Sequence, residues 1–352
     1  MLTEDSRARL LRRLNGEMRL RLLTVPRRPE TFDVLKGTPE ELDFYGLPAQ
    51  PDKKDELAFE LWKGLVTTAA VPLEQWFAIL PLPLLDYRII FNQMIGGTHQ
   101  ETSKNWSGAV TQAAAGLPFQ QVLARWQIPN IGLPSGAANG VEYRCSTWIG
   151  LDGAVPTSWS MPQIGTTQSV VLKNGAPQYT FEAWFQWWMR IQPNPPVKIA
   201  SIDLAPGDVV HCALQVQGPN VVNMSIANTT KNQSYTASVV APAITIPLPS
   251  MPPYNLSAAV EGKTAEWVAE RPTKLDSTEL YPLPDFDRVT FEGALAQTGT
   301  PVIARGMSPG RLVRMTERHQ GQTIVLSRAR QDASDPDHKL YVGPGLEADM
   351  VS

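Results

Sequence analysis

The sequence predicts a mainly β protein, an antiparallel β-sandwich or jelly roll that follows a mostly helical N-terminal segment. From about residue 105 onward, short strand-like runs alternate with Gly, Pro and Asn turns, and almost no helical period lies between them. The 31 prolines and 25 glycines fit many short strands joined by turns. With 352 residues, 43% of them hydrophobic, the chain can form one large domain or two smaller ones with real cores.

Residues 1–96 differ from the rest because their apolar residues follow a helical spacing. Leu10, Leu14, Met18 and Leu22 form one stripe of a basic helix. We interpret its charged side as a solvated face of a helix docked on its own protein, with contact to a membrane or nucleic acid as the alternative. The whole segment is expected to be a helical unit, either a prosegment or a permanent domain.

Two further helices are predicted in this segment. Over residues 38–46 (TPEELDFYG), Thr38 can cap the N-terminus, Glu41 completes a capping box and Gly46 ends the helix. Residues 55–66 (DELAFELWKGLV) form an amphipathic helix. Its apolar side carries Ala58, Leu61, Trp62 and Leu65.

The predicted strands lie in a second unit, residues 97–330, which we expect to be the β-sandwich. Hairpin turns are expected at residues 173–178 (KNGAPQ) and 228–234 (NTTKNQS), and a Pro-rich crossing loop at residues 241–255. Residues 331–352 are expected to be a loose, acidic C-terminal tail. The strand-like runs are residues 105–113, 141–153, 169–192, 199–217, 221–240, 265–270, 286–297 and 322–330.

Composition and motifs exclude several classes of function. The net charge of −3 gives no global field for nucleic acid or an acidic membrane. The apolar run at residues 77–91 is too short for a membrane span and contains charged residues. Serine hydrolase, zinc protease, phosphate-loop and dinucleotide motifs are absent, so no metal or cofactor is predicted. Cys145 and Cys212 permit one disulfide, but buried free thiols are an equally good interpretation.

Residues 264–272 (TAEWVAERP) contain the most suggestive carboxylates. The run has the appearance of a strand that ends at a proline, and the alternation of side chains then places Glu266, Val268 and Glu270 on one face. A solvated outer face is the ordinary interpretation of such a pair. A working carboxylate in a cleft is the alternative.

Six segments, taken in order, resemble the glutamic peptidases, or eqolisins. The resemblance covers most of residues 104–297. NWSGAV at 105–110 is similar to the opening strand of the family, and STWIGLDG at 146–153 to its A-W-V-G-I-D-G strand. MPQIGTT at 161–167 contains a glutamine followed one residue later by glycine, and FEAWFQWW at 181–188 resembles Y-D-A-W-Y-E-W. The last segments are IDLAPGDVV at 202–210 with IANTTKNQSYT at 226–236, and AEWVAE at 265–270.

The resemblance implies a peptidase with a sandwich of two curved sheets and substrate bound in the concave face. Gln163 and Glu270 then correspond to the catalytic pair, because the family uses the second glutamate of its A-E-x-x-x-E pattern. The remaining implied site residues surround this pair as substrate-binding residues. They are Trp106, Trp148, Asp152, Glu182, Trp184, Gln186 and Glu266. Two departures from the pattern are Gln186, where a carboxylate is common, and Arg271, where an aspartate is common.

This pair implies endopeptidase chemistry at acid pH without a metal. Glu270 would act as the general base that activates water, and Gln163 would stabilise the oxyanion. The alternative is an inactive jelly-roll module that binds carbohydrate or protein through aromatic residues such as Trp184, Trp187 and Trp188. The expected partner is a polypeptide substrate, with no nucleic acid and no membrane span, and a monomer is expected.

A few sequence features bear on the localisation of the protein and on the pH at which it works. The N-terminus has no apolar region of a secretory signal, although members of the resembling family are typically secreted. Sequons at Asn105 and Asn228 matter only in a eukaryotic secretory route. The 31 Lys and Arg residues and four His would give a large positive charge in strong acid, so an optimum of about pH 4 to 6 is expected.

Overall fold

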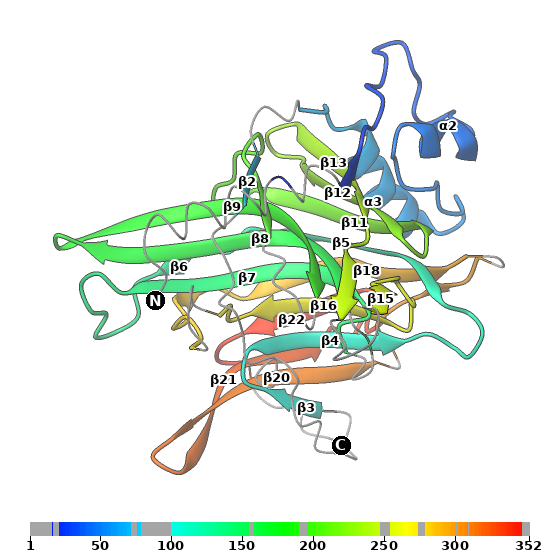
Figure 1. Ribbon diagram of the computed structural model, residues 1–352. Coiled ribbons are helices and arrows are strands. Elements are labelled where there is room, and N and C mark those ends of the chain that lie inside the picture. Colours follow the sequence, from blue (N-terminus) through cyan, green and yellow to red (C-terminus); the bar gives the residue numbers. More distant parts are fainter. Residues whose placement is uncertain are drawn as a thin grey trace.

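The computed structural model describes a β-sandwich with a short helical unit packed against it (Figure 1). The described residues are 16, 21–71, 76–78, 100–154, 158, 160–189, 196–246, 254–273, 279–299, 302–308 and 310–346. The expected helical stripe at Leu10, Leu14 and Met18 lies outside them. Leu22 belongs to a short strand, not to a helix.

Most of the described strands form one eighteen-stranded sheet that folds over into two layers. Layer A runs in the order β1 (Leu22–Leu23), β13 (Gln233–Val240), β12 (Val221–Asn228), β11 (Val209–Gly218), β5 (Phe119–Gln127), β18 (Val289–Thr298), β22 (Lys339–Gly343) and β21 (Gln322–Gln331). Every pairing in this layer is antiparallel. The predicted antiparallel β-sandwich is therefore confirmed.

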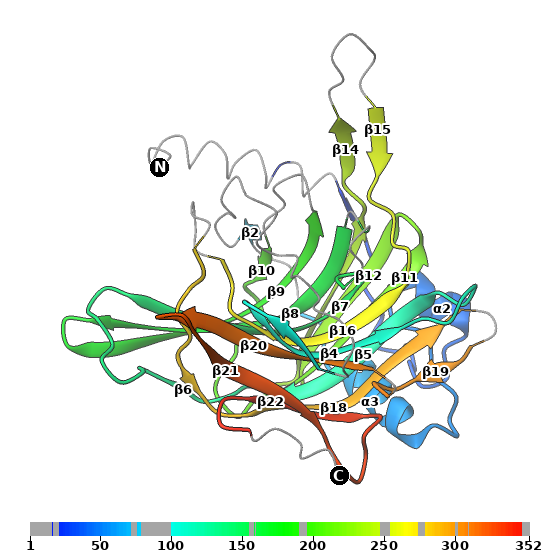
Figure 2. The same cartoon turned by 90° about the horizontal axis from the view of Figure 1, so that it is seen from below.

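Layer B contains the strands that carry the predicted site. Its order is β2 (Trp76–Ala78), β10 (Val197–Ile199), β9 (Ala176–Met189), β8 (Ser160–Lys173), β7 (Glu142–Leu151), β16 (Thr264–Glu270), β4 (Trp106–Gln112) and β20 (Arg311–His319). Because β20 also pairs with β21, the two layers are continuous. Figure 2 shows the curvature of the long strands in this layer.

Short strands complete the described part of the chain. β3 (Gln100–Ser103) runs parallel to β20, and β19 (Ala304–Arg305) pairs with β18. β6 (Ile131–Gly132) pairs with β17 (Asp285–Phe286). The expected crossing loop at residues 241–255 instead contains a two-stranded ribbon, β14 (Ala243–Ile246) and β15 (Tyr254–Ser257), which projects from the sandwich in Figure 2.

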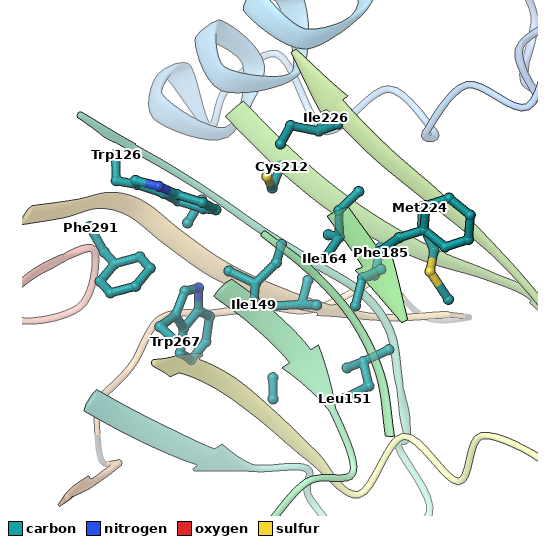
Figure 3. Packing of buried hydrophobic residues seen from close by; sticks show 14 of the residues in the cluster. Trp126, Ile149, Leu151, Ile164, Phe185, Cys212, Met224, Ile226, Trp267 and Phe291 are labelled. Atoms are coloured by element: carbon teal, nitrogen blue, oxygen red, sulfur yellow. The ribbon is translucent and has the colours of Figure 1, made fainter. Parts of the chain in front are cut away.

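The core lies between the two layers (Figure 3). Layer B contributes Ile149 and Trp267, and layer A contributes Trp126 and Phe291, all fully buried. Each of the two tryptophans also crosses the core with its indole N–H. Trp126 donates to the Thr166 hydroxyl over 3.3 Å, and Trp267 donates to the Leu123 carbonyl over 3.1 Å. The tryptophans therefore fix the spacing of the layers as well as filling the core.

Both predicted hairpins form. The β8–β9 turn places Asn174 and Gly175 at φ values of 52° and 79°, the left-handed pair that a two-residue hairpin turn requires. Strands β12 and β13 pair from Asn228 and Gln233 outward, with Asn232 at a positive φ in their turn. The first turn makes β8 and β9 a continuous pair of fourteen-residue strands. These strands carry Gln163 and Gln186.

Helix α2 (Pro39–Phe44) begins with the predicted capping box, because Thr38 and Glu41 exchange hydrogen bonds. Helix α3 (Glu56–Thr67) packs on the outer face of layer A (Figure 1). There Leu61 approaches Gly293 so closely that a Cβ at this glycine would lie 1.8 Å from its Cδ1 atom. The helical unit is therefore closely fitted to the sandwich. Its buried face includes the predicted Ala58, Leu61, Trp62 and Leu65.

The described part of the C-terminal segment, residues 331–346, does not form the expected loose tail. Residues 339–343 form β22, which pairs with both β18 and β21. Leu340 and Val342 are fully buried in the core, so the described part of this segment belongs to the sandwich. The alternation of apolar residues in KLYVG indicates a strand in the sequence. The acidic residues around this run concealed that pattern.

Cys145 and Cys212 are both buried free thiols, and burial raises the pKa of each. Among the residues described here, no helix is both long enough and apolar enough to cross a membrane.

Candidate active site

The predicted catalytic residues lie on the face of layer B that turns away from the core. The β16 residues Ala265, Trp267 and Ala269 belong to the core, so the alternating residues Glu266, Val268 and Glu270 face outward. The register extends this face across the neighbouring strands in three rows. The rows are Trp106–Glu270–Ser146–Thr167–Glu182, Gly108–Val268–Trp148–Gly165–Trp184 and Val110–Glu266–Gly150–Gln163–Gln186.

Glu270 is held by two N–H donors at the end of β16. Its Oε2 accepts a hydrogen bond from the Trp148 indole over 2.8 Å, and its Oε1 accepts one from the Asn105 amide over 3.1 Å. Asn105 is held in turn, because its Oδ1 accepts from the Ser103 hydroxyl over 3.0 Å. The carboxylate therefore has a fixed orientation while its residue stays partly exposed.

Opposing effects act on the protonation of Glu270. Burial raises the pKa of its carboxyl above the ordinary value, because the charged form loses solvation. The side chains of Trp148, Trp106 and Asn105 act in the opposite direction, because their N–H groups favour the ionised form. A raised pKa suits a carboxyl group that takes up and returns a proton in acid.

Asn105 is a site residue that the sequence analysis did not assign. Its only signal there was the sequon Asn105-Trp106-Ser107. The side chain is buried and occupied by Glu270 and Ser103, so the sequon is closed to glycosylation in the folded protein. Asn228, in the other sequon considered, is also buried and donates to the carboxylate of Asp208.

Gln163 lies on β8 directly opposite Gln186 of β9. Its Nε2 donates to the Gln186 Oε1 over 2.6 Å, and both residues are nearly closed to solvent, with exposures of 3% and 5%. The Gln163 Oε1 has no hydrogen-bond partner among the residues described. Leaving a buried carbonyl without a hydrogen-bond partner costs free energy. This oxygen is therefore available to accept a hydrogen bond from a group that enters the site.

Strand β7 separates Gln163 from Glu270. They are two strands apart and four residues out of register on a curved sheet (Figure 2). Trp148 lies between them on β7. Its ring extends over Gly150, where a Cβ would meet it at 2.8 Å, while its N–H reaches Glu270. The two predicted residues share a face, and no described hydrogen bond joins them.

Glu266 lies in the same row as Gln163 but differs sharply from Glu270 in environment. It is fully buried, and its Oε1 accepts a hydrogen bond from the Ala154 backbone N–H over 3.1 Å. Burial raises the pKa of Glu266 to about 8, and the nearby charge of Asp152 adds to this shift. Glu266 therefore stays protonated in acid.

The Asp152 carboxylate holds a loop of the protein in place. The residue is buried at a positive φ of 68°, just beyond the end of β7. Its carboxylate accepts backbone N–H groups of residues 261, 262 and 263 over 2.7, 3.0 and 2.6 Å. Burial raises the pKa of Asp152, and these three hydrogen bonds oppose that shift. This carboxylate anchors the loop that leads into β16 and so fixes the start of the strand that carries Glu270.

The other predicted residues surround the pair. Trp106 and Trp148 meet edge to face with ring centroids 5.0 Å apart. Glu182 forms an ion pair with Lys198 of β10 over 2.7 Å. Trp184 is buried in a cluster of apolar side chains on this face, together with Trp148, Met161, Trp188 and Val268. The site face thus carries a buried tryptophan cluster and two polar centres, Glu270 and the Gln163–Gln186 pair.

Arg271, one of the two departures noted in the sequence, faces away from this chemistry. Its guanidinium donates to the Tyr281 carbonyl over 2.5 Å and pairs with Glu317 over 3.1 Å. The described contacts give it a role in fastening the end of β16 to neighbouring segments.

Comparisons with known proteins identify the family of this chain. The model of the Peptidase A4 family matches residues 104–335. Aspergillopepsin-2 of Aspergillus niger is 25% identical over 232 residues, which cover 59% of this chain and 69% of that protein.

Solved structures similar to this chain include a scytalido-glutamic peptidase bound to a peptide-based transition-state analogue, with 16% identity and a TM-score of 0.49. The likeness covers 68% of this chain and 98% of that one. The aspergilloglutamic peptidase of Aspergillus niger has 21% identity and a TM-score of 0.42, with coverage of 57% and 98%. Because the family match spans more than half of the sequence, the chain belongs to the Peptidase A4 family and is a glutamic peptidase.

Proposed function

We propose that this peptidase hydrolyses polypeptides with Glu270 as general base and Gln163 as the residue that stabilises the oxyanion. The observation that carries the proposal is the carboxylate of Glu270, held in a fixed orientation between Trp148 and Asn105 on a residue that is partly exposed. The open carbonyl of Gln163 on the same face supports it. The cluster of buried tryptophans between them would line the path of an extended polypeptide substrate once it is uncovered.

The reaction needs only these two side chains and water. Ionised Glu270 takes a proton from water as the water oxygen attacks the scissile carbonyl carbon. A Gln163 N–H donates to the developing oxyanion, while its carbonyl can orient the water. Protonated Glu270 then returns the proton to the departing nitrogen as the C–N bond breaks, which yields a carboxylic acid and an amine.

The environments of the two glutamates favour Glu270 over Glu266 as the general base. Glu266 is level with Gln163, but it is fully buried and its pKa of about 8 keeps it protonated in acid. A protonated acid cannot take a proton from water. Glu270 has exposed surface and three N–H side chains that favour its ionised form. Glu270 therefore suits the base, and Glu266 suits a neutral wall of the site.

Two matched substitutions test this assignment. We expect Glu270→Gln to abolish hydrolysis of casein across pH 2 to 7 and Glu266→Gln to retain most of it. Circular dichroism would check that both variants fold. Unchanged turnover in folded Glu270→Gln would overturn the proposal, and reversed effects would assign the base to Glu266. Gln163→Ala should lower kcat by about 100-fold or more with a smaller change in KM.

We also propose that residues 1–96 are a prosegment and residues 97–330 the peptidase domain. The supporting observation is that Gln163 is closed to solvent in the full chain, although a substrate must reach it. Strand β2 belongs to residues 1–96 and pairs with β10, beside the strand that carries Gln186. Incubation in acid followed by N-terminal sequencing tests this. Full activity of an intact chain would contradict it.

A further inference from the structure

The Gln163 amide has two ends, and its function depends on which end faces the substrate. Stabilising an oxyanion requires an N–H, and orienting water requires the carbonyl. An amide that is free to flip would present the wrong atoms for part of the time. A neighbouring residue that accepts only one end removes this ambiguity.

Gln186 is placed to do this. Strands β8 and β9 pair continuously, so Gln163 and Gln186 stand directly opposite each other. The Gln186 Oε1 accepts one N–H of Gln163 over 2.6 Å. This leaves the second N–H of Gln163 for the oxyanion and its Oε1, which has no partner among the described residues, for water.

The surroundings of Gln186 restrict its own movement. Trp184 and Trp188 precede and follow it by two residues on β9, so all three side chains emerge on the same face. Both tryptophans are buried with Met161 in the apolar cluster of the site. Gln186 itself is only 5% exposed, so its side chain has little room to move away from Gln163.

The amide of Gln186 also differs from a carboxylate in that it does not change its protonation with pH. A carboxylate in this position would accept the same N–H when ionised, but on protonation it would carry an O–H donor. That donor would attract the Gln163 carbonyl and favour the flipped amide. A glutamine side chain does not titrate, so its preference is the same at every pH at which Glu270 can work.

We propose that Gln186 is a positioning residue that holds the Gln163 amide in its working orientation independently of pH. This inference rests on the proposed function. It assigns Gln186 an action through Gln163 instead of a direct contact with the substrate.

The test compares Gln186→Met, Gln186→Glu and the matched control Gln178→Glu across pH 3 to 7 with one peptide substrate. Gln178 lies on the same strand but is exposed, so its replacement adds the same charge away from the site. We expect Gln186→Met to lower kcat about 10- to 100-fold with KM changed by less than about threefold.

The pH profile separates positioning from a structural role. Gln186→Glu should keep near-normal kcat where the new carboxyl is ionised and lose about tenfold where it is protonated. The acid limb of log kcat then steepens from a slope of one toward two, whereas Gln178→Glu should keep the normal slope. Because this readout is a slope within one folded variant, it remains available if Gln186→Met does not fold.

Failure of this inference differs from failure of the proposed function. Unchanged kcat in Gln163→Ala would refute the role of Gln163 itself. An inactive Gln163→Ala beside a fully active Gln186→Met, or an unaltered slope in Gln186→Glu, would overturn only the role of Gln186. In the double variant, Gln186→Met should add little to the loss caused by Gln163→Ala, because both act through one amide.

Discussion

Replacing Glu266 by glutamine should make the protein more stable near neutral pH. Burial raises the pKa of this carboxyl from 4.5 in the unfolded chain to about 8 in the folded protein. Its contribution to stability is fully present below the unfolded value and is lost as pH rises through the folded value. Between pH 4 and pH 7 the unfolded chain releases this proton while the folded protein keeps it. The loss is about 3 kcal/mol.

A glutamine side chain has the shape of the protonated acid and does not ionise. Its carbonyl can accept the N–H of Ala154 that Glu266 now receives. Its N–H group can donate toward the buried hydroxyl of Thr264, which lies beside the Glu266 carboxyl group. We therefore expect Glu266→Gln to match the original protein near pH 4 and to exceed its unfolding free energy by about 3 kcal/mol at pH 7.

Urea unfolding at pH 4, 5.5 and 7 would measure this difference. Placing both proteins in a Glu270→Gln background would prevent self-digestion of unfolded chains. Glu60→Gln is a suitable control, because the Glu60 carboxylate is exposed in a surface ion pair with Lys63. A difference between Glu266→Gln and its parent that stays constant with pH would refute the reasoning, as would a less stable variant at pH 7.

Three other substitutions test further features. Asn105→Ala removes one donor from Glu270, so the pKa of this base should rise and the acid limb of kcat should shift to higher pH; an unmoved limb would exclude a role for Asn105. Leu340→Ala should cost about 2 to 4 kcal/mol in urea unfolding, since β22 belongs to the core, whereas a loose tail predicts no change. His211→Asn should gain about 3 kcal/mol relative to its parent between pH 7 and pH 4, because burial lowers the pKa of His211 to about 4; a pH-independent difference would contradict this.

The sequence contained the signals for most of the sandwich and for the helical caps. Strands are set by a local period of two and helices by local capping, so β16 and the Thr38–Glu41 capping box could be read directly. The strand β22 was missed because it is short and surrounded by acidic residues. Its place is decided by pairing with β18, a contact that depends on residues far away in the chain.

The site was predictable in its residue types but not in its partnerships. Resemblance to the family suggested Gln163 and Glu270, but no local pattern could show that Asn105 would reach a carboxylate 165 positions away. The same limit applies to Asp152. A buried aspartate with three backbone donors requires the loop at residues 261–263 to fold around it, and its neighbours in sequence do not encode that loop.

Two buried groups outside the proposed chemistry make the stability of this protein depend on pH in opposite directions. Glu266 destabilises the fold as pH rises above about 4.5 toward its folded pKa of about 8. His211 acts in the opposite direction. Burial holds its pKa near 4, the Leu61 carbonyl of α3 lies 3.1 Å from its Nδ1, and Arg125 and Glu292 lie around it with opposing charges. The stability that neutral His211 provides is present above about pH 6.5 and is lost as pH falls toward 4. Because the two pH windows overlap, the summed cost stays near about 3 kcal/mol from pH 4 to pH 7, so a gain at one group is offset at the other and the two together favour mild acid only slightly.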